Sequence, residues 1–162
     1  MSYKLSNRSK SNLVGVHPDL VRVVERAIEI TEHDFTVFEG TRTREKQVEN
    51  YKRGVSRAID GSRHLVGKDG YAHAVDLVPW IGYLTWDWDR IYPIANAVRD
   101  ASKELGVPIK WGGAWDVLLN EQDADSRDIV QAYNARRRAM GRSSFTDGPH
   151  FELPLSPEYP QF

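Results

Sequence analysis

The spacing of apolar positions predicts four helices. In residues 18–30 and 89–105, apolar side chains recur every three or four positions, which is the period of a helix that buries one face. A mostly polar stretch, residues 44–53, follows the capping residue Thr43, so we expect a surface helix there. The fourth helix is expected over residues 126–140. Glycine, a common residue at helix C-termini, follows three of the four helices, at Gly54, Gly106 and Gly141.

Short apolar runs predict the strands. They occupy residues 35–38, 72–78, 107–111 and 151–153, and residues 80–88 between them suggest a loop or a hairpin. Several of these runs lie too close together for helical crossovers, which favours an α+β fold with a small, mostly antiparallel sheet. A length of 162 residues fits one domain, from 1 to 162, in which the polar residues 1–12 and the tail 154–162 are expected to be peripheral.

The composition argues against nucleic acid and membranes as binding partners. The 22 basic and 23 acidic residues give a net charge of −1, so no overall field attracts nucleic acid or an anionic membrane. The polar N-terminus lacks the apolar core of a signal peptide, and no stretch suits membrane insertion. We therefore expect a monomer made in the cytoplasm, which needs another protein to leave the cell.

The absence of cysteine leaves histidine and carboxylate as the candidate metal ligands. Two of the five histidines, His17 and His33, stand at predicted helix ends, where capping or solvation explains them. The other three are His64, His73 and His150. Two histidines and one carboxylate would hold zinc with an open position for water, whose pKa such a site brings to about 7.

Strand parity distinguishes His64 from His73. His73 and Asp76 are an odd number of positions apart, so on one regular strand they point to opposite faces. We therefore pair His64 with Asp76 and keep His73 as the weaker alternative. Near the C-terminus, Pro149 favours an extended Gly148, which lets Asp147 approach a metal-bound water as general base. An ordinary Asp-Gly turn is the alternative for Asp147.

The order of four short motifs resembles a known family, the VanY-like zinc peptidases. These D-Ala-D-Ala carboxypeptidases and L-alanyl-D-glutamate endopeptidases include small phage endolysins. The resemblance spans about residues 40–153 and rests on the segments Ser62-Arg-His64, Ala74-Val-Asp76, Trp111-Gly-Gly113 and Asp147-Gly-Pro-His150. It implies zinc bound by His64, Asp76 and His150, and Asp147 as the general base.

The resemblance also implies a substrate-binding group. Arg42, in a matching Gly-x-Arg segment, would steady a carbonyl or carboxylate of the substrate, with a surface salt bridge as the alternative. We expect Ser62 to bind substrate as well. Trp111 and Trp115 are candidates for the cleft wall, although core packing also explains large aromatic residues beside a strand.

Two local features depart from the family pattern, and two others have ordinary explanations. Residues 68–72 enlarge the loop between the first histidine and the aspartate. Ala114 stands where relatives commonly carry an acidic residue, and Asp116 is the candidate replacement. The acidic stretch 116–128 favours a solvated loop over a calcium site, and the arginines at 136–138 favour a solvated helix face over a binding patch.

The expected function is a zinc endopeptidase that cuts the stem peptide of peptidoglycan between L-Ala and D-Glu. It would act as a phage endolysin in host-cell lysis and reach the wall through a membrane lesion made by another protein. One alternative is a bacterial D,D-carboxypeptidase or dipeptidase of cell-wall metabolism. Another is a binding module that keeps zinc for stability and has lost catalysis.

Overall fold

The computed structural model describes residues 2–54 and 62–162. One sheet with the strand order β1-β2-β5-β3-β4 runs through this part of the chain, and each neighbouring pair is antiparallel. Its strands are β1 (Phe35–Glu39), β2 (Ala74–Pro79), β3 (Lys110–Trp111), β4 (Ala114–Leu118) and β5 (His150–Glu152). The predicted α+β fold with an antiparallel sheet is confirmed.

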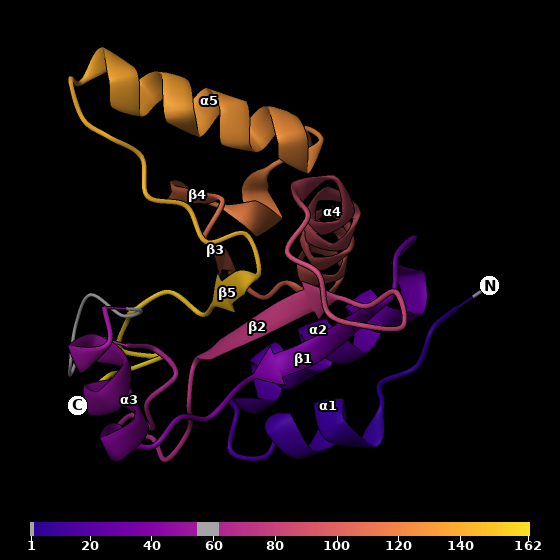
Figure 1. Cartoon of the computed structure of the whole chain (residues 1–162), viewed down its shortest axis with the longest axis vertical. Helices are drawn as coiled ribbons and strands as arrows, with labels where there is room; N and C mark the ends of the chain where they lie inside the picture. The colour runs from indigo at the N-terminus through magenta and orange to yellow at the C-terminus, as the bar shows by residue number, and fades with distance from the viewer. Residues whose placement is uncertain (1, 55–61) are drawn as a thin grey trace.

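Helices cover one face of the strands β1 and β2. The helical elements are α1 (Asn7–Asn12), α2 (Pro18–Ile30), α3 (Arg44–Lys52), α4 (Trp88–Leu105), the short 3-10 turn η1 (Leu119–Glu121) and α5 (Ser126–Ala139). In Figure 1, α2 lies behind β1 and β2, and α2 packs against α4. Their apolar faces form the core together with strand residues such as Val37, Val75 and Leu77. The apolar positions that recur every three or four residues in these two helices therefore lie in the core, as predicted.

The predicted helix ends match the structure closely. The side chains of Thr43, Asp87 and Asp125 accept hydrogen bonds from backbone N–H groups in the first turns of α3, α4 and α5. Gly106 ends α4 with a φ of 67°, a left-handed conformation that a glycine adopts without steric cost. None of the helices in the described ranges has both the length and the hydropathy needed to cross a bilayer.

The N-terminal segment, expected to be peripheral, contains α1 and packs on the edge strand β1. Ser9 is fully buried, and its hydroxyl accepts a hydrogen bond of 2.9 Å from the backbone N–H of Val37. The side-chain amide of Asn12 donates to the Val37 carbonyl at 2.8 Å. These polar side chains satisfy backbone groups that an edge strand would otherwise expose. The polar composition of residues 1–12 thus reflects hydrogen bonding to the sheet.

The acidic stretch after residue 115, expected to be a solvated loop, instead contains most of β4 and the turn η1. Leu119 is 1% exposed and belongs to the core, and Val117 packs against the core. The acidic residues of this stretch made it look solvated as a whole, although Val117 and Leu119 are apolar. The expectation of a loop was wrong because a short edge strand needs only one half-buried face.

The C-terminal tail is held against the loop that precedes β2. The buried guanidinium of Arg63 donates hydrogen bonds of 2.9 Å to the carbonyls of Leu153 and Tyr159 and one of 2.8 Å to the side chain of Gln161. The backbone N–H of Lys68 donates to the Gln161 carbonyl at 2.7 Å. Tyr159 is 2% exposed. The tail and the enlarged loop therefore support each other.

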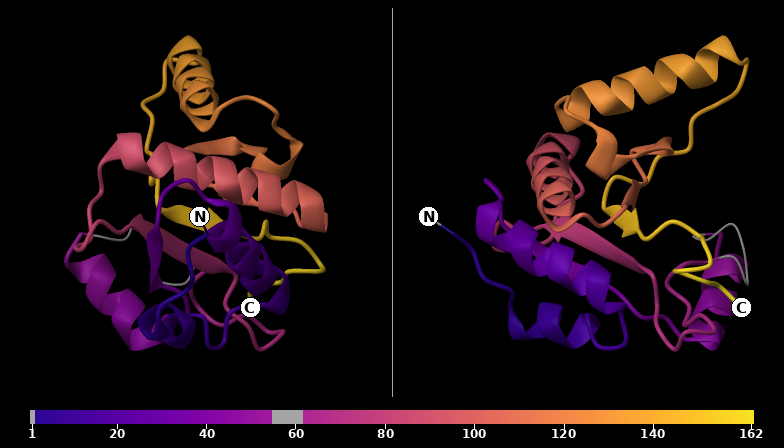
Figure 2. Two further views of the ribbon diagram at one scale, coloured as in Figure 1. Left: turned by 90° about the vertical axis from the view of Figure 1, so that its right-hand side faces the viewer. Right: turned by 180° about the vertical axis from the view of Figure 1, so that it is seen from behind.

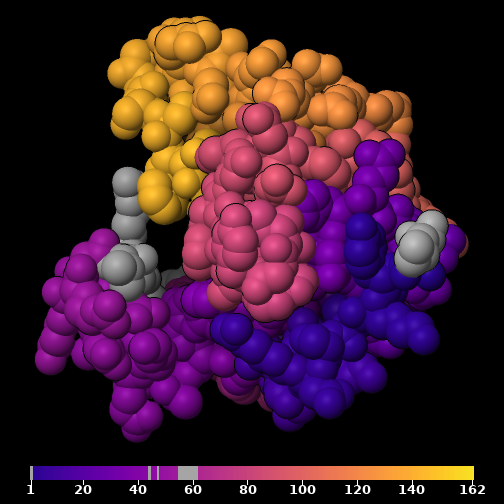
Figure 3. Space-filling model, turned by 45° about the vertical axis from the view of Figure 1, so that its right-hand side comes forward, coloured from indigo at the N-terminus to yellow at the C-terminus, as the bar shows by residue number. Residues whose placement is uncertain are grey.

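The helix α3 lies at one end of the molecule, and α5 packs against the edge strand β4 at the other. Figures 1 and 2 show α3 and α5 at opposite ends of the molecule, with β2 and β5 between them. In the space-filling view of Figure 3, the purple α3 region and the orange to yellow C-terminal segment lie on the same side of the molecule, below and above. The strands β2 and β5, which carry two of the three candidate metal ligands, lie between these two ends.

Candidate metal centre and active site

His64, Asp76 and His150 converge on one point. One ligand atom from each lies within 4.8 Å of the other two, and this is the one such group of His and carboxylate side chains in the described part of the chain. Asp76 on β2 is directly opposite His150 on β5, so both side chains project from the same face of the sheet. His64 comes from the loop before β2. The pairing chosen from strand parity is therefore the one that the fold brings together.

His73 lies away from this group. Its ring is fully buried, and its Nε2 atom is 2.8 Å from a carboxylate oxygen of Asp69, in the enlarged loop. The ring lies 5.8 Å from that of His17, at the N-terminus of α2. His17 itself caps α2 by accepting a hydrogen bond from the N–H of Asp19, as expected for a helix start. Neither histidine is in the group formed by His64, Asp76 and His150.

Hydrogen bonds orient both imidazoles of the group. The Nδ1 atom of His64 is 2.7 Å from the Gly40 carbonyl, which can only accept, so Nδ1 carries the proton and Nε2 faces Asp76 at 3.3 Å. The Nε2 atom of His150 is 2.8 Å from a Glu152 oxygen, and its Nδ1 lies 3.2 Å from the same Asp76 oxygen. A second partner that fixes the ring in this way is typical of metal-binding histidines.

The electrostatics of the group favour a bound cation or protons. Burial alone would lower the pKa of His150, but hydrogen bonds to the carboxylates of Asp76 and Glu152 raise it to about 10. Burial would raise the pKa of Asp76, yet the charges and hydrogen bonds of His64 and His150 hold it well below its usual range. A largely desolvated carboxylate beside two imidazoles is stabilised by positive charge, which a divalent metal ion supplies.

Asp147 is held beside the group by the Trp-Gly-Gly motif. Its backbone N–H donates to the Gly112 carbonyl at 2.8 Å, and the Gly112 N–H donates to the His150 carbonyl at 2.8 Å. A Cβ atom at Gly112 would lie only 2.1 Å from the Asp147 carbonyl oxygen, which explains the glycine. Burial, and then the charge of Asp76, raise the pKa of Asp147. A carboxylate with a raised pKa next to a metal site suits a general base.

Arg42 lies at the border of the same site. Its guanidinium donates to the Glu39 carboxylate, with Nη2 to Oε2 at 2.8 Å, and its Nη1 is 3.4 Å from the Ser62 hydroxyl. Burial would lower the pKa of Arg42, but the hydrogen bond and charge of Glu39, with the charges of Asp76 and Asp147, raise it. Arg42 therefore forms a salt bridge with Glu39, and its positive charge also interacts with the carboxylates of Asp76 and Asp147.

The two tryptophans have different roles. Trp115 is partly exposed, and its ring centroid is 5.4 Å from that of His150, so it borders the site. Trp111 is 1% exposed, stacks on Phe151 and donates its indole N–H to the Gly148 carbonyl at 2.7 Å. This burial corrects the expectation that Trp111 lines the cleft: it packs behind the turn that carries Asp147.

Two further residues need comment. Asp116, the candidate replacement for a missing acidic residue, forms two hydrogen bonds of 2.7 and 2.8 Å with Arg136 on the surface. Asp116 therefore joins β4 to α5, and its carboxylate does not take the place of the missing acidic residue at the site. Glu152, for which the sequence predicted no role, is the partner of His150. Its place two positions after His150 in a strand, on the same face, was the available signal.

Comparisons with known proteins agree with this geometry. A family model described as phage L-alanyl-D-glutamate peptidase matches residues 1–154. The chain belongs to this family. The L-alanyl-D-glutamate peptidase of Escherichia phage T5 is 33% identical over 131 residues, which cover 78% of this chain and 92% of that protein.

A solved structure extends the agreement to the fold. The L-Ala D-Glu endopeptidase ChiX of Serratia marcescens superposes with a TM-score of 0.67 at 34% identity, covering 94% of this chain and 91% of that one. The resemblance inferred from the four motifs is thus confirmed, and the protein is a peptidase. In this peptidase, the group of His64, Asp76 and His150 can bind a metal ion.

Proposed function

We propose that this peptidase is a zinc enzyme that hydrolyses the L-Ala–D-Glu bond in the stem peptides of peptidoglycan and serves as a phage endolysin. The observation that supports this most is the convergence of His64, Asp76 and His150 beside the half-buried carboxylate of Asp147. The names of the two relatives supply the scissile bond. Two imidazoles and one carboxylate, each already oriented by the fold, suit zinc with one open position.

The residues of the chain divide the work of hydrolysis. Zinc, when bound by His64, Asp76 and His150, supplies Lewis-acid chemistry and lowers the pKa of water. Asp147 accepts a proton from the attacking water and transfers it to the leaving amine. The buried position of Asp147 raises its pKa, which makes it a better proton acceptor and a competent donor afterwards. Because Asp147 both accepts the proton from water and donates it to the leaving amine, the mechanism needs no separate general acid.

Arg42 and the residues near it position the substrate. The guanidinium is held by Glu39 and approaches the Ser62 hydroxyl, so it enters the reaction already oriented. A planar cation of this kind binds a carbonyl oxygen that gains negative charge, or a substrate carboxylate. Trp115 borders the group next to His150. In this arrangement Arg42, Ser62 and Trp115 hold the peptide across the metal ligands.

The proposal includes the setting in which the enzyme acts. The described residues form one core cluster, which supports a single domain. We also propose that the enzyme works as a monomer. Delivery to the wall through a membrane lesion made by a second phage protein completes the proposed route. Peptidoglycan is the partner.

The test separates binding of zinc from catalysis. Wild type, Asp147→Ala, His64→Ala and the control His33→Ala, altered outside the site, would be compared for zinc content and for fragments released from intact sacculi, identified by mass. We expect zinc near one per chain in all but His64→Ala, and hydrolysis only in wild type and the control. Undiminished lysis by Asp147→Ala would refute the mechanism. Release of D-Ala alone would instead support a carboxypeptidase.

A further inference from the structure

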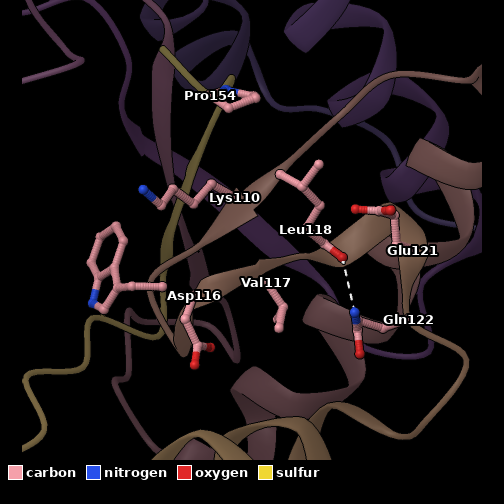
Figure 4. A pocket seen from close by; sticks show the side chains of 8 residues that line it. Lys110, Asp116, Val117, Leu118, Glu121, Gln122 and Pro154 are labelled. Atoms are coloured by element: carbon pink, nitrogen blue, oxygen red, sulfur yellow. Dashed lines mark hydrogen bonds between the residues drawn. The ribbon is translucent and has the colours of Figure 1, made fainter. Parts of the chain in front are cut away.

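An open pocket of about 620 Å³ is lined mainly by residues of β3, β4 and η1 (Figure 4). Trp115 lines it, and the ring of Trp115 is 5.4 Å from that of His150. Lys110, a second lining residue, lies directly opposite Glu152 in the pairing of β3 with β5. Glu152 in turn is hydrogen-bonded to His150. The pocket therefore approaches His150 in two ways, through Trp115 and through the Lys110–Glu152 pair. Its volume is in the range of pockets that bind small molecules, roughly 300–1,000 Å³.

The pocket carries charges of both signs that the protein leaves uncompensated. Lys110 is partly buried and Glu121 is exposed, and within the described ranges neither has an ion-pair partner. Figure 4 shows that they enter from different elements, β3 and η1. The third charged residue of the pocket, Asp116, is neutralised by Arg136. The available groups are therefore one ammonium and one carboxylate.

The two sides of the scissile bond differ in charge. The L-Ala side is joined through an amide to the sugar strand and has no ionised group near the bond. The other side begins with D-Glu, which has a free carboxylate, and continues with a diamino acid, whose side chain bears an amine. Only this second side offers a carboxylate for Lys110 and an amine for Glu121.

We infer that this pocket binds the leaving part of the stem peptide, with Lys110 on a carboxylate and Glu121 on the amine of the diamino acid. The inference rests on the proposed function and adds a subsite to it. The contacts are partly open to water, so each contributes modestly and weakens with salt. A tenfold change in affinity, which corresponds to about 1.4 kcal/mol, is the effect expected for Lys110.

The kinetic test uses two synthetic stem peptides. One carries free carboxylates and a free side-chain amine, and in the other these carboxylates are amidated and the amine is acetylated. For Lys110→Met we expect KM to rise roughly tenfold on the charged peptide with kcat within about twofold of wild type, and little change on the blocked peptide. Glu121→Gln should raise KM on the charged peptide by roughly threefold. Lys10→Met, on the exposed side of α1, is the control and should match wild type.

A binding measurement keeps this inference separate from the proposed function. The leaving fragment, D-Glu joined to the diamino acid, would be titrated into zinc-loaded wild type and Lys110→Met by calorimetry. We expect roughly tenfold weaker binding to the variant. If wild type cleaves stem peptides but both proteins bind the fragment equally, the subsite is wrong and the proposed function stands. If the fragment binds selectively but no peptide is cleaved, the proposed function fails and the subsite stands.

Discussion

Replacing Gly112 by alanine tests whether the Trp-Gly-Gly motif positions the general base. The backbone of Gly112 joins the two ends of the Asp147 to His150 turn, accepting from the Asp147 N–H and donating to the His150 carbonyl, each at 2.8 Å. An added Cβ would lie 2.1 Å from the Asp147 carbonyl oxygen and 3.1 Å from the Asp147 Cβ. The alanine can be accommodated only if this turn moves.

The size of the movement follows from ordinary contact distances. A carbon and a carbonyl oxygen approach to about 3.3 Å, so Asp147 must retreat by roughly 1 Å. A displacement of about 1 Å at a catalytic group costs on the order of 100-fold in rate. The crowding should also lower the free energy of unfolding by roughly 1–3 kcal/mol. We therefore expect kcat to fall about 100-fold while the protein remains folded.

Gly106→Ala is the matched control. Gly106 ends α4 with a φ of 67° and has open space around its Cα, so alanine there strains the backbone without touching the site. Both variants would be assayed for hydrolysis of a stem peptide, for zinc content and for thermal unfolding. The control should lose stability, by about 1 kcal/mol, and keep its kcat. If Gly112→Ala is as active as Gly106→Ala, the turn does not depend on this glycine as we argue.

Three further predictions concern the surroundings of the metal group. Glu152→Gln weakens the acceptor of the His150 N–H, so zinc affinity measured by chelator competition should fall roughly 10- to 100-fold; an unchanged affinity would contradict the role of Glu152. Arg63→Met leaves the carbonyls of the C-terminal segment without donors and should cost roughly 3 kcal/mol in denaturant unfolding, which a loss below about 0.5 kcal/mol would disprove. For Asp147, the raised pKa means that the folded, metal-free protein holds its proton more tightly than the unfolded chain does. This residue's contribution to stability therefore falls as pH rises through that range, and Asp147→Asn should stabilise the metal-free protein at pH 7; a variant less stable than wild type there would show that burial does not dominate.

The elements that the sequence predicted well are those with a strong period. The apolar spacing of residues 18–30 and 89–105 matched α2 and α4 because each buries a continuous stripe against the other. The helix α1 has no such stripe. It is fixed by hydrogen bonds from Ser9 and Asn12 to β1, and a polar side chain that bonds to a distant strand leaves no periodic pattern. Tertiary contacts of this kind cannot be read from local sequence.

The candidate site shows the same division. Parity along a strand predicted that His73 and Asp76 lie on opposite faces, and in the structure His73 directly precedes β2 and faces Asp69, away from the group that contains Asp76. The tryptophans gave no comparable signal. Trp111 and Trp115 both flank Gly-Gly, yet one is 1% exposed and the other borders the metal group. An aromatic residue beside a strand can lie in the core or at the border of a site. Only the stacking of Trp111 on Phe151 in the folded structure shows that Trp111 belongs to the core.

The enlarged loop and the C-terminal tail belong together. The family match ends at residue 154, and the tail beyond it lies on the loop: a Cβ at Gly67 would meet the Pro160 carbonyl at 2.4 Å. Asp69 in the loop turns inward to His73, and Arg63 joins the loop to the tail. Arg63 directly precedes His64 in the chain, so these contacts brace the segment that carries this candidate ligand. The loop and the tail therefore stabilise the position of His64.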